Sequence, residues 1–322
     1  MIYLFLLIFS FLLTYYIKNY YTKNAIFDEV NERSSHTIPT PHGGGIAISI
    51  TWFLGLIYLY FMNEIRADLF YALLVGVIIS IVSYFDDIYD LSAKLRIIIQ
   101  SLVAIGGLFF IGGFESIDIG IYLFTNQIIT NVFAFLLILW FINLYNFLDG
   151  INGYAGVEAV FLCLAGFILF GDNHFIILLV SVFGFLYWNW NKAKIFMGDV
   201  GSTLLGYNIA IFTLYYGNLD NTNLWIWIIL FSVFWFDATL TLIRRKLNNE
   251  KLSQAHKKHG YQRLTQSGLS HLSVSLLAIF LNLCLFGIIY FISNTFVAFL
   301  VSLILLYSAM RLIDYRKSFD IS

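Results

Sequence analysis

The feature that most constrains this chain is a series of apolar segments with only short polar stretches between them. About 20 apolar residues are needed to cross the hydrocarbon core of a bilayer. Eleven segments come close to or meet that length: 1–18, 43–62, 68–85, 95–113, 127–147, 152–170, 174–190, 201–217, 223–243, 272–292 and 295–312. Charged residues make up only 11% of the chain, against about 25% in soluble domains. The sequence therefore predicts an all-α, polytopic integral membrane bundle, with residues 1–322 as a single domain.

The positions of lysine and arginine predict the orientation of this bundle. If the N-terminus lies outside, 17 of the 18 cations fall on one side of the membrane and only Arg66 on the other. The positive-inside rule makes the cation-rich side cytoplasmic and places the C-terminus there as well. The loops predicted to face the cytoplasm and carry the chemistry are about 19–42, 86–94, 148–151, 191–200 and 244–271.

A group of carboxylates follows the third apolar segment. Asp86 and Asp87 are adjacent, and Asp90 and Lys94 follow Asp86 at intervals of four residues. In a continuing helix, Asp86, Asp90 and Lys94 would share one face. Adjacent carboxylates repel when ionised and are costly to bury, so we expect this site to handle a cation or a proton.

A second polar group ends the fifth apolar segment. Asn143, Asn146 and Asp149 fall within an arc of roughly 120° on a helix. Amide and carboxylate oxygens are hard ligands that suit Mg²⁺. The alternative is a helix end with Gly150 as its cap, but that does not account for two further polar residues on the same face.

A third group precedes the eighth apolar segment, where Lys192 and Lys194 are followed by the turn Gly198-Asp199-Val200-Gly201-Ser202. Free N–H groups at a helix start favour phosphate, and an aspartate there could hold its metal. The alternative is that Asp199 or Ser202 only caps the helix.

The last polar loop is basic and carries His256, His259 and Arg263. Because lysines flank the histidines, an anion site for phosphate is favoured over zinc. Attraction of a basic loop to anionic lipid is the alternative. For Asp237, within the ninth segment, a functional role and simple pairing with a neighbouring helix or with the nearby arginines are equally favoured.

The first polar loop contains both prolines and ends in three glycines, Gly43 to Gly45. These glycines could approach a phosphate, but a turn followed by a small-residue helix contact is favoured.

Taken in order, these motifs resemble those of the polyprenyl-phosphate N-acetylhexosamine-1-phosphate transferases, glycosyltransferase family 4. The resemblance covers roughly residues 31–271 and rests on motifs that begin at Asp86, Asn143 and Phe196 and on the histidine-containing last loop. Arg33-Ser-Ser-His36, the Pro39–Gly45 stretch and the His256-x-x-His259-x-Tyr261-Gln262 spacing are similar to the subgroup that initiates O-antigen or outer-core oligosaccharides.

The resemblance implies an enzyme of the bacterial inner membrane that transfers a sugar 1-phosphate from a UDP-N-acetylhexosamine to undecaprenyl phosphate and releases UMP. It further implies that Asp199 and Asn146 ligate Mg²⁺, with Mn²⁺ as a substitute. Asp86 and Asp87 would include the catalytic base. The expected substrate- and phosphate-binding residues are Lys94, Asn143, Asp149, His256, His259 and Arg263.

The other expected partners are the lipid bilayer and a second copy of the chain in a homodimer; no nucleic acid is expected. The rival hypothesis is a transporter, which would predict carboxylates near the bilayer midplane and a repeat between the two halves. Here Asp86, Asp149 and Asp199 all lie at predicted cytoplasmic helix ends, which favours the enzyme.

Overall fold

The computed structural model describes residues 1–27, 39–252, 254 and 256–319 and is almost entirely helical. In chain order the helices are α1 (Ile2–Lys23), α2 (Gly44–Phe61), α3 (Ala67–Leu74), α4 (Gly76–Tyr89), α5 (Ala93–Phe110), α6 (Gln127–Phe147), α7 (Tyr154–Phe170), α8 (Asn173–Asn189), α9 (Asp199–Leu219), α10 (Asn221–Leu230), α11 (Ser232–Leu247), α12 (Gly260–Gln266), α13 (His271–Phe291) and α14 (Thr295–Arg316). Between α5 and α6, the strands β1 (Ile117–Asp118) and β2 (Leu123–Phe124) pair antiparallel.

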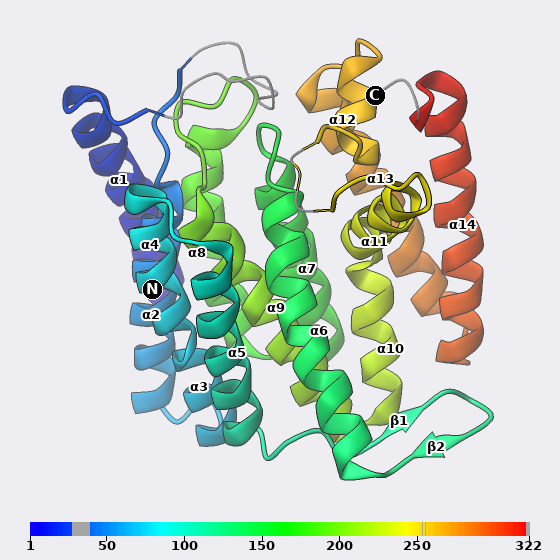
Figure 1. The fold of residues 1–322 in the computed structure, drawn as a ribbon. Coiled ribbons are helices and arrows are strands. Elements are labelled where there is room, and N and C mark those ends of the chain that lie inside the picture. The colour runs from blue at the N-terminus through cyan, green and yellow to red at the C-terminus, as the bar shows by residue number, and fades with distance from the viewer. Residues whose placement is uncertain (28–38, 253, 255, 320–322) are drawn as a thin grey trace.

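Most of the long helices run in roughly the same direction, so the bundle has two ends (Figure 1). We call one the motif end; it carries α12 and the turns at residues 148–153 and 190–198. We call the other the hairpin end, because β1 and β2 lie there (Figure 1). Arg66, the cation predicted to lie apart from all others, sits in the α2–α3 connection and pairs with Asp68.

Each of the eleven predicted apolar segments coincides with a helix or with a broken pair of helices. By length and composition, seven helical segments of the described chain can cross a membrane, or eight if the bent pair α10–α11 is one span. The prediction of a polytopic helical membrane protein is thereby confirmed. The ninth predicted segment is not straight, because α10 and α11 meet at 72°.

Side-chain caps fix several helix starts. The hydroxyl of Ser92 accepts from the Leu95 N–H at 3.3 Å and begins α5. The Asn126 amide oxygen accepts from Ile128 N–H at 3.0 Å and begins α6. Ser270 and Asn294 do the same for α13 and α14. These residues satisfy backbone donors that the first turn of a helix otherwise leaves unpaired.

Helix α9 lies at the centre of the bundle and contacts α2, α3, α4, α6 and α10. Every residue from Val200 to Gly217 is buried. A helix covered by protein on all sides need not be as apolar as one that faces lipid, which explains the asparagine and threonines in its sequence. The central position brings the Asp199 end of α9 among the helices that carry the other motifs.

Glycines allow the close approach between α9 and its neighbours. A Cβ built on Gly45 of α2 would lie 2.2 Å from the Gly201 nitrogen, and one on Gly206 would lie 2.4 Å from the Phe141 carbonyl oxygen of α6. The N–H groups of Gly44 and Gly45 donate to the carbonyls of Phe196 and Met197 at 2.9 and 2.8 Å. The predicted small-residue contact of the glycine stretch is thus confirmed. Arg33 and His36 lie outside the described residues.

Candidate active site

Four carboxyl groups from three parts of the chain meet at the motif end. Asp86 and Asp87 lie in the last turn of α4, Asp149 follows α6, and Asp199 begins α9. Burial raises the pKa of Asp199, and the neighbouring side chains of Asn146 and Asp86 lower it and raise it, respectively, so both lie beside the Asp199 carboxyl. Burial, together with the charges of Asp199 and Asp87, raises the pKa of Asp149 well above its usual range. We call these four residues the carboxylate cluster.

One guanidinium partly balances the carboxylate cluster. Arg96 Nη1 donates to Asp86 Oδ2 at 3.1 Å, and the Leu91 N–H donates to Asp86 Oδ1 at 2.8 Å. Asp86 itself is only 8% exposed. Lys94, which was predicted to share a helical face with Asp86, is exposed, and Arg96 is the cation paired with Asp86.

The predicted common face of Asp86, Asp90 and Lys94 is wrong. Helix α4 ends at Tyr89, and Asp90 turns the chain with a φ of +50°. Aspartate tolerates this left-handed conformation better than most residues. Helix α5 is a new helix that begins after Ser92. In this arrangement Arg96, rather than Lys94, contacts Asp86.

The side chain of Asp87, from α4, contacts the start of α9. Its Oδ1 accepts from the Asp199 N–H at 3.2 Å. A Cβ built on Gly198, whose φ is +74°, would lie 2.9 Å from Asp87 Oδ2, so glycine is needed there for both its conformation and its size. The prediction that free N–H groups at this helix start await phosphate is therefore corrected: Asp87 accepts from Asp199. The alternative cap, the side chain of Asp199 or Ser202, is also absent at the start of α9.

Of the three residues on the predicted polar arc of α6, two reach the cluster. The side chain of Asn146 lies beside Asp199 and lowers its pKa. Asp149 lies close enough to Asp199 for the charge of Asp199 to raise the pKa of Asp149. Asn143 instead donates to Gln100 Oε1 of α5 at 2.8 Å and to the Leu139 carbonyl at 2.7 Å. These contacts make Asn143 a link between α5 and α6; its predicted role in substrate binding stays a prediction.

Asp237 anchors the loop of residues 256–259, which we call the histidine loop, and the start of α12. Its carboxylate accepts from the N–H groups of Gly260 at 2.7 Å and Tyr261 at 3.3 Å, and its Oδ1 lies 3.7 Å from His259 Nδ1. Of the two roles considered, pairing with a neighbouring helix is the one observed, and the partner is α12. A carboxylate at a helix N-terminus is stabilised by the helix dipole.

The two histidine rings lie side by side, with centroids 4.8 Å apart. Burial is the main cause that lowers the pKa of His256, to about 4, so this imidazole is neutral at pH 7. The hydroxyl of Tyr261 donates to the Phe147 carbonyl at 3.1 Å. A Cβ on Gly150 would lie 2.1 Å from that hydroxyl oxygen, so the histidine loop is packed directly against the turn that carries Asp149.

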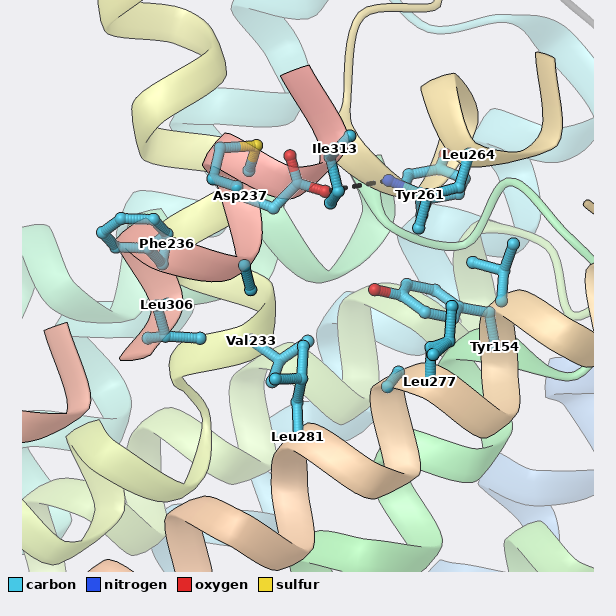
Figure 2. A pocket seen from close by; sticks show the side chains of 14 residues that line it. Tyr154, Val233, Phe236, Asp237, Tyr261, Leu264, Leu277, Leu281, Leu306 and Ile313 are labelled. Carbon is cyan, nitrogen blue, oxygen red and sulfur yellow. Dashed lines mark hydrogen bonds between the residues drawn. The ribbon is translucent and has the colours of Figure 1, made fainter. Parts of the chain in front are cut away.

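A small apolar pocket of about 60 Å³ lies under α12, between α11, α13 and α14. Figure 2 shows its aliphatic lining, with Val233, Leu277 and Leu281 on one side and the Asp237–Tyr261 hydrogen bond above. Polar groups facing such a space are costly unless they are paired, so this bond also keeps α12 seated.

Arg263 was predicted to bind phosphate, and the structure places it elsewhere. Its side chain is fully buried. Nη1 donates to Asp314 Oδ1 at 2.7 Å and to the Lys317 carbonyl at 3.0 Å. These hydrogen bonds to α14 and to Lys317 indicate a structural role for Arg263.

The residues around Asp199 suit a hard cation. In the described part of the chain, no group of three or more His, Cys, Asp or Glu side chains is arranged to hold a metal ion by itself. Mg²⁺, in contrast, is commonly held by one or two carboxylates, with water and substrate phosphates completing the shell. Asp199, with Asp86 beside it and the Asn146 amide, fits that requirement.

Much of the chain is similar to known proteins. Residues 69–217 match the model of glycosyl transferase family 4. The chain is 33% identical over 291 residues to a probable undecaprenyl-phosphate N-acetylglucosaminyl 1-phosphate transferase of Bacillus subtilis, covering 86% of this chain and 80% of that protein. It is 26% identical to an undecaprenyl-phosphate alpha-N-acetylglucosaminyl 1-phosphate transferase of Thermotoga maritima, over 80% and 79% of the two chains. It is 27% identical to a decaprenyl-phosphate N-acetylglucosaminephosphotransferase of Mycobacterium leprae, over 76% and 71%.

Proposed function

This chain belongs to glycosyl transferase family 4, and from that premise we propose that it transfers a sugar 1-phosphate from a UDP-N-acetylhexosamine to undecaprenyl phosphate. An oxygen of the lipid phosphate attacks the sugar-bearing phosphorus of the donor, the P–O bond to UMP breaks, and UMP leaves. N-Acetylglucosamine is the proposed sugar, because the names of the relatives above specify it. The product would begin a cell-envelope glycan, of which O-antigen is one kind.

The observation that carries this proposal is the carboxylate cluster at one end of a membrane bundle. Its four carboxyl groups are accompanied by the Arg96 guanidinium, so the cluster favours a cation there. Two phosphate groups repel each other, and their reaction requires charge neutralisation and alignment. A cation at this position, between a membrane-embedded acceptor and a soluble donor, would meet both requirements.

The residues divide into three proposed roles. Asp199 and Asn146 would hold Mg²⁺, which would neutralise charge on the donor diphosphate. Asp86 and Asp87 would include the base that takes a proton from the lipid phosphate where one remains. Little proton abstraction is needed, because the second pKa of a phosphomonoester is near 6. His256 and His259, at the start of α12, would bind the diphosphate.

The location of the reaction follows from the same proposal. The motif end would face the cytoplasm of a bacterial inner membrane, because that is where the cations of the chain gather and where a nucleotide sugar is available. A homodimer remains part of this proposal as well.

The test is UMP release by membranes that contain the protein, supplied with undecaprenyl phosphate, Mg²⁺ and a panel of UDP-N-acetylhexosamines. Release that requires lipid, metal and one sugar supports the proposal and identifies the donor. Membranes with the Asp199→Asn variant, at equal protein level, are the matched control. If folded wild-type protein releases no UMP with any donor, the proposal is wrong and the transporter hypothesis returns.

A further inference from the structure

A single carboxylate near the end of the chain joins three helices at the motif end. Asp314 of α14 accepts from both Nη atoms of Arg244 in α11, at 2.8 and 2.9 Å, and from Nη1 of Arg263 in α12, at 2.7 Å. The Arg263 side chain is 0% exposed and that of Asp314 is 25% exposed. Two-pronged arginine–carboxylate pairs are among the strongest and most directional polar contacts in proteins.

The residues after α14 complete this junction. The Lys317 carbonyl accepts from Arg263 at 3.0 Å. The buried ring of Phe319 lies 5.5 Å from the guanidinium carbons of Arg244 and Arg263 and 5.1 Å from the ammonium of Lys258. Cations over an aromatic face are attracted to its π electrons. Asp314, Lys317 and Phe319 therefore contact a group of three cations, which are Arg244, Lys258 and Arg263. We call these six residues the C-terminal latch.

The latch acts directly on the histidine loop. Arg263 is four residues after His259, which places both in the single short helix α12 of seven residues and its cap. So short a helix is not stable without tertiary contacts. Asp237 holds its first residues and Asp314 holds Arg263, so the two carboxylates together determine where the histidines lie.

The carboxylate cluster is built by other elements. Helix α14 packs on α10, α11, α12 and α13, whereas the cluster residues come from α4, α9 and the turn after α6. Loss of Asp314 should therefore loosen the histidine loop while leaving Asp86, Asp87 and Asp199, which lie on α4 and α9, in place. Loss of a residue that only stabilised the whole bundle would disturb the histidine loop and the carboxylate cluster alike.

We propose that Asp314 is a positioning residue for donor binding, which holds the His256–His259 loop against the Asp149 turn through Arg263 and Arg244. The inference rests on the proposed function, in which that loop binds the donor diphosphate. In a variant without the latch, the loop occupies its binding position in a smaller fraction of molecules, and donor affinity falls by that fraction.

The test compares Asp314→Asn with Asp68→Asn. Both changes remove a carboxylate charge from an arginine pair, and the two carboxylates are similarly exposed, at 25% for Asp314 and 31% for Asp68. The partner of Asp68 is the exposed Arg66, and this pair lies at the hairpin end. For Asp314→Asn we expect the KM for the UDP-sugar to rise about tenfold, with kcat and the KM for undecaprenyl phosphate changed less than about twofold. Asp314→Glu should recover most of the loss, and Asp68→Asn should match the wild type.

A second measurement reads the latch without activity. Limited trypsin digestion of the detergent-purified protein should cut after Lys251 or Lys257 at least about threefold faster in Asp314→Asn than in Asp68→Asn, because local opening becomes more frequent. If Asp314→Asn does not fold, Phe319→Leu, a milder change to the latch, takes its place in both experiments.

The outcomes separate the two proposals. If wild-type protein turns over and Asp314→Asn shows an unchanged donor KM and unchanged digestion, the positioning role is wrong. A lower thermal midpoint with unchanged donor KM would mean that Asp314 is only structural. If the wild type releases no UMP at all, the proposed function fails, while faster digestion of the variant would still show that the latch holds the loop.

Discussion

Both ends of the bundle gather carboxylates, but the two ends differ in how those carboxylates are paired. At the motif end, Asp86, Asp87, Asp149 and Asp199 lie close enough to affect one another, and Arg96 is the cation that the structure pairs with them. When these four carboxyl groups are ionised, their negative charge exceeds the positive charge of the Arg96 guanidinium.

At the hairpin end, Asp68, Asp118 and Asp172 each have their own partner. Asp68 pairs with Arg66 at 2.6 Å, and Asp118 accepts from the Gly120 N–H at 2.8 Å. The hydroxyl of Tyr216 donates to Asp172, and His174 Nε2 lies 3.2 Å from the same hydroxyl. These arrangements are complete without a ligand.

The comparison teaches that the number of acidic residues does not identify a site; the imbalance of charge does. Mutually close carboxylates that share too few cations are stable only with a proton or a bound cation. Carboxylates with one partner each serve the fold. The same aspartate-to-asparagine change should therefore abolish function in the carboxylate cluster and affect only stability at the paired aspartates of the hairpin end.

The largest effect is expected for Asp199→Asn. The change removes the charge that would hold Mg²⁺, and we expect UMP release to fall at least about a thousandfold, together with loss of the response to added Mg²⁺. The measurement is a titration of UMP release with Mg²⁺ in membranes that contain equal amounts of folded protein. Turnover by the variant without added metal would rule out Asp199 as a ligand.

The second largest effect is expected for Arg96, which the structure pairs with Asp86. It is compared with Lys94, which the sequence predicts to bind substrate. Arg96→Gln removes the partner of Asp86 and should lower kcat/KM by about 10- to 100-fold. Lys94→Gln, two residues away on an exposed side chain, should have a smaller effect. The two variants are compared in parallel for kcat/KM with the UDP-sugar. A larger loss for Lys94→Gln would mean that Lys94 meets the substrate and that Arg96 only supports α4.

Sequence patterns are sufficient to place the helices, and for a physical reason. Membrane helices must be long and apolar, so hydropathy along the chain locates eleven segments, and each coincides with helical residues. The breaks within those segments are not predicted in this way. The 72° angle between α10 and α11 has no proline or charge in the sequence that would mark it.

The candidate site was predicted in part. Asp86, Asp87, Asn146, Asp149 and Asp199 do come together, because each ends or begins a helix at the same end of the bundle. Arg96 was missed because its approach depends on the turn at Asp90, where the spacing of the carboxylates predicts a continuous helix. The placements of Asn143 and Arg263 depended on which neighbouring helices offer partners, here Gln100 and Asp314. Such tertiary pairings are not contained in the spacing of residues along one helix.

The smallest effect is expected at the hairpin end. Asp172→Asn keeps an oxygen that can accept from Tyr216 but removes the charge from that hydrogen bond, so we expect the free energy of unfolding to fall by about 1–2 kcal/mol. UMP release per folded molecule should stay the same, because Asp172 binds Tyr216 near the end of α9 that lies opposite to Asp199. The measurements are the thermal midpoint in detergent and UMP release at a temperature well below it. If turnover fell while the protein remained folded, the hairpin end would have a role in the reaction, and charge imbalance would no longer separate the functional carboxylates from the structural ones.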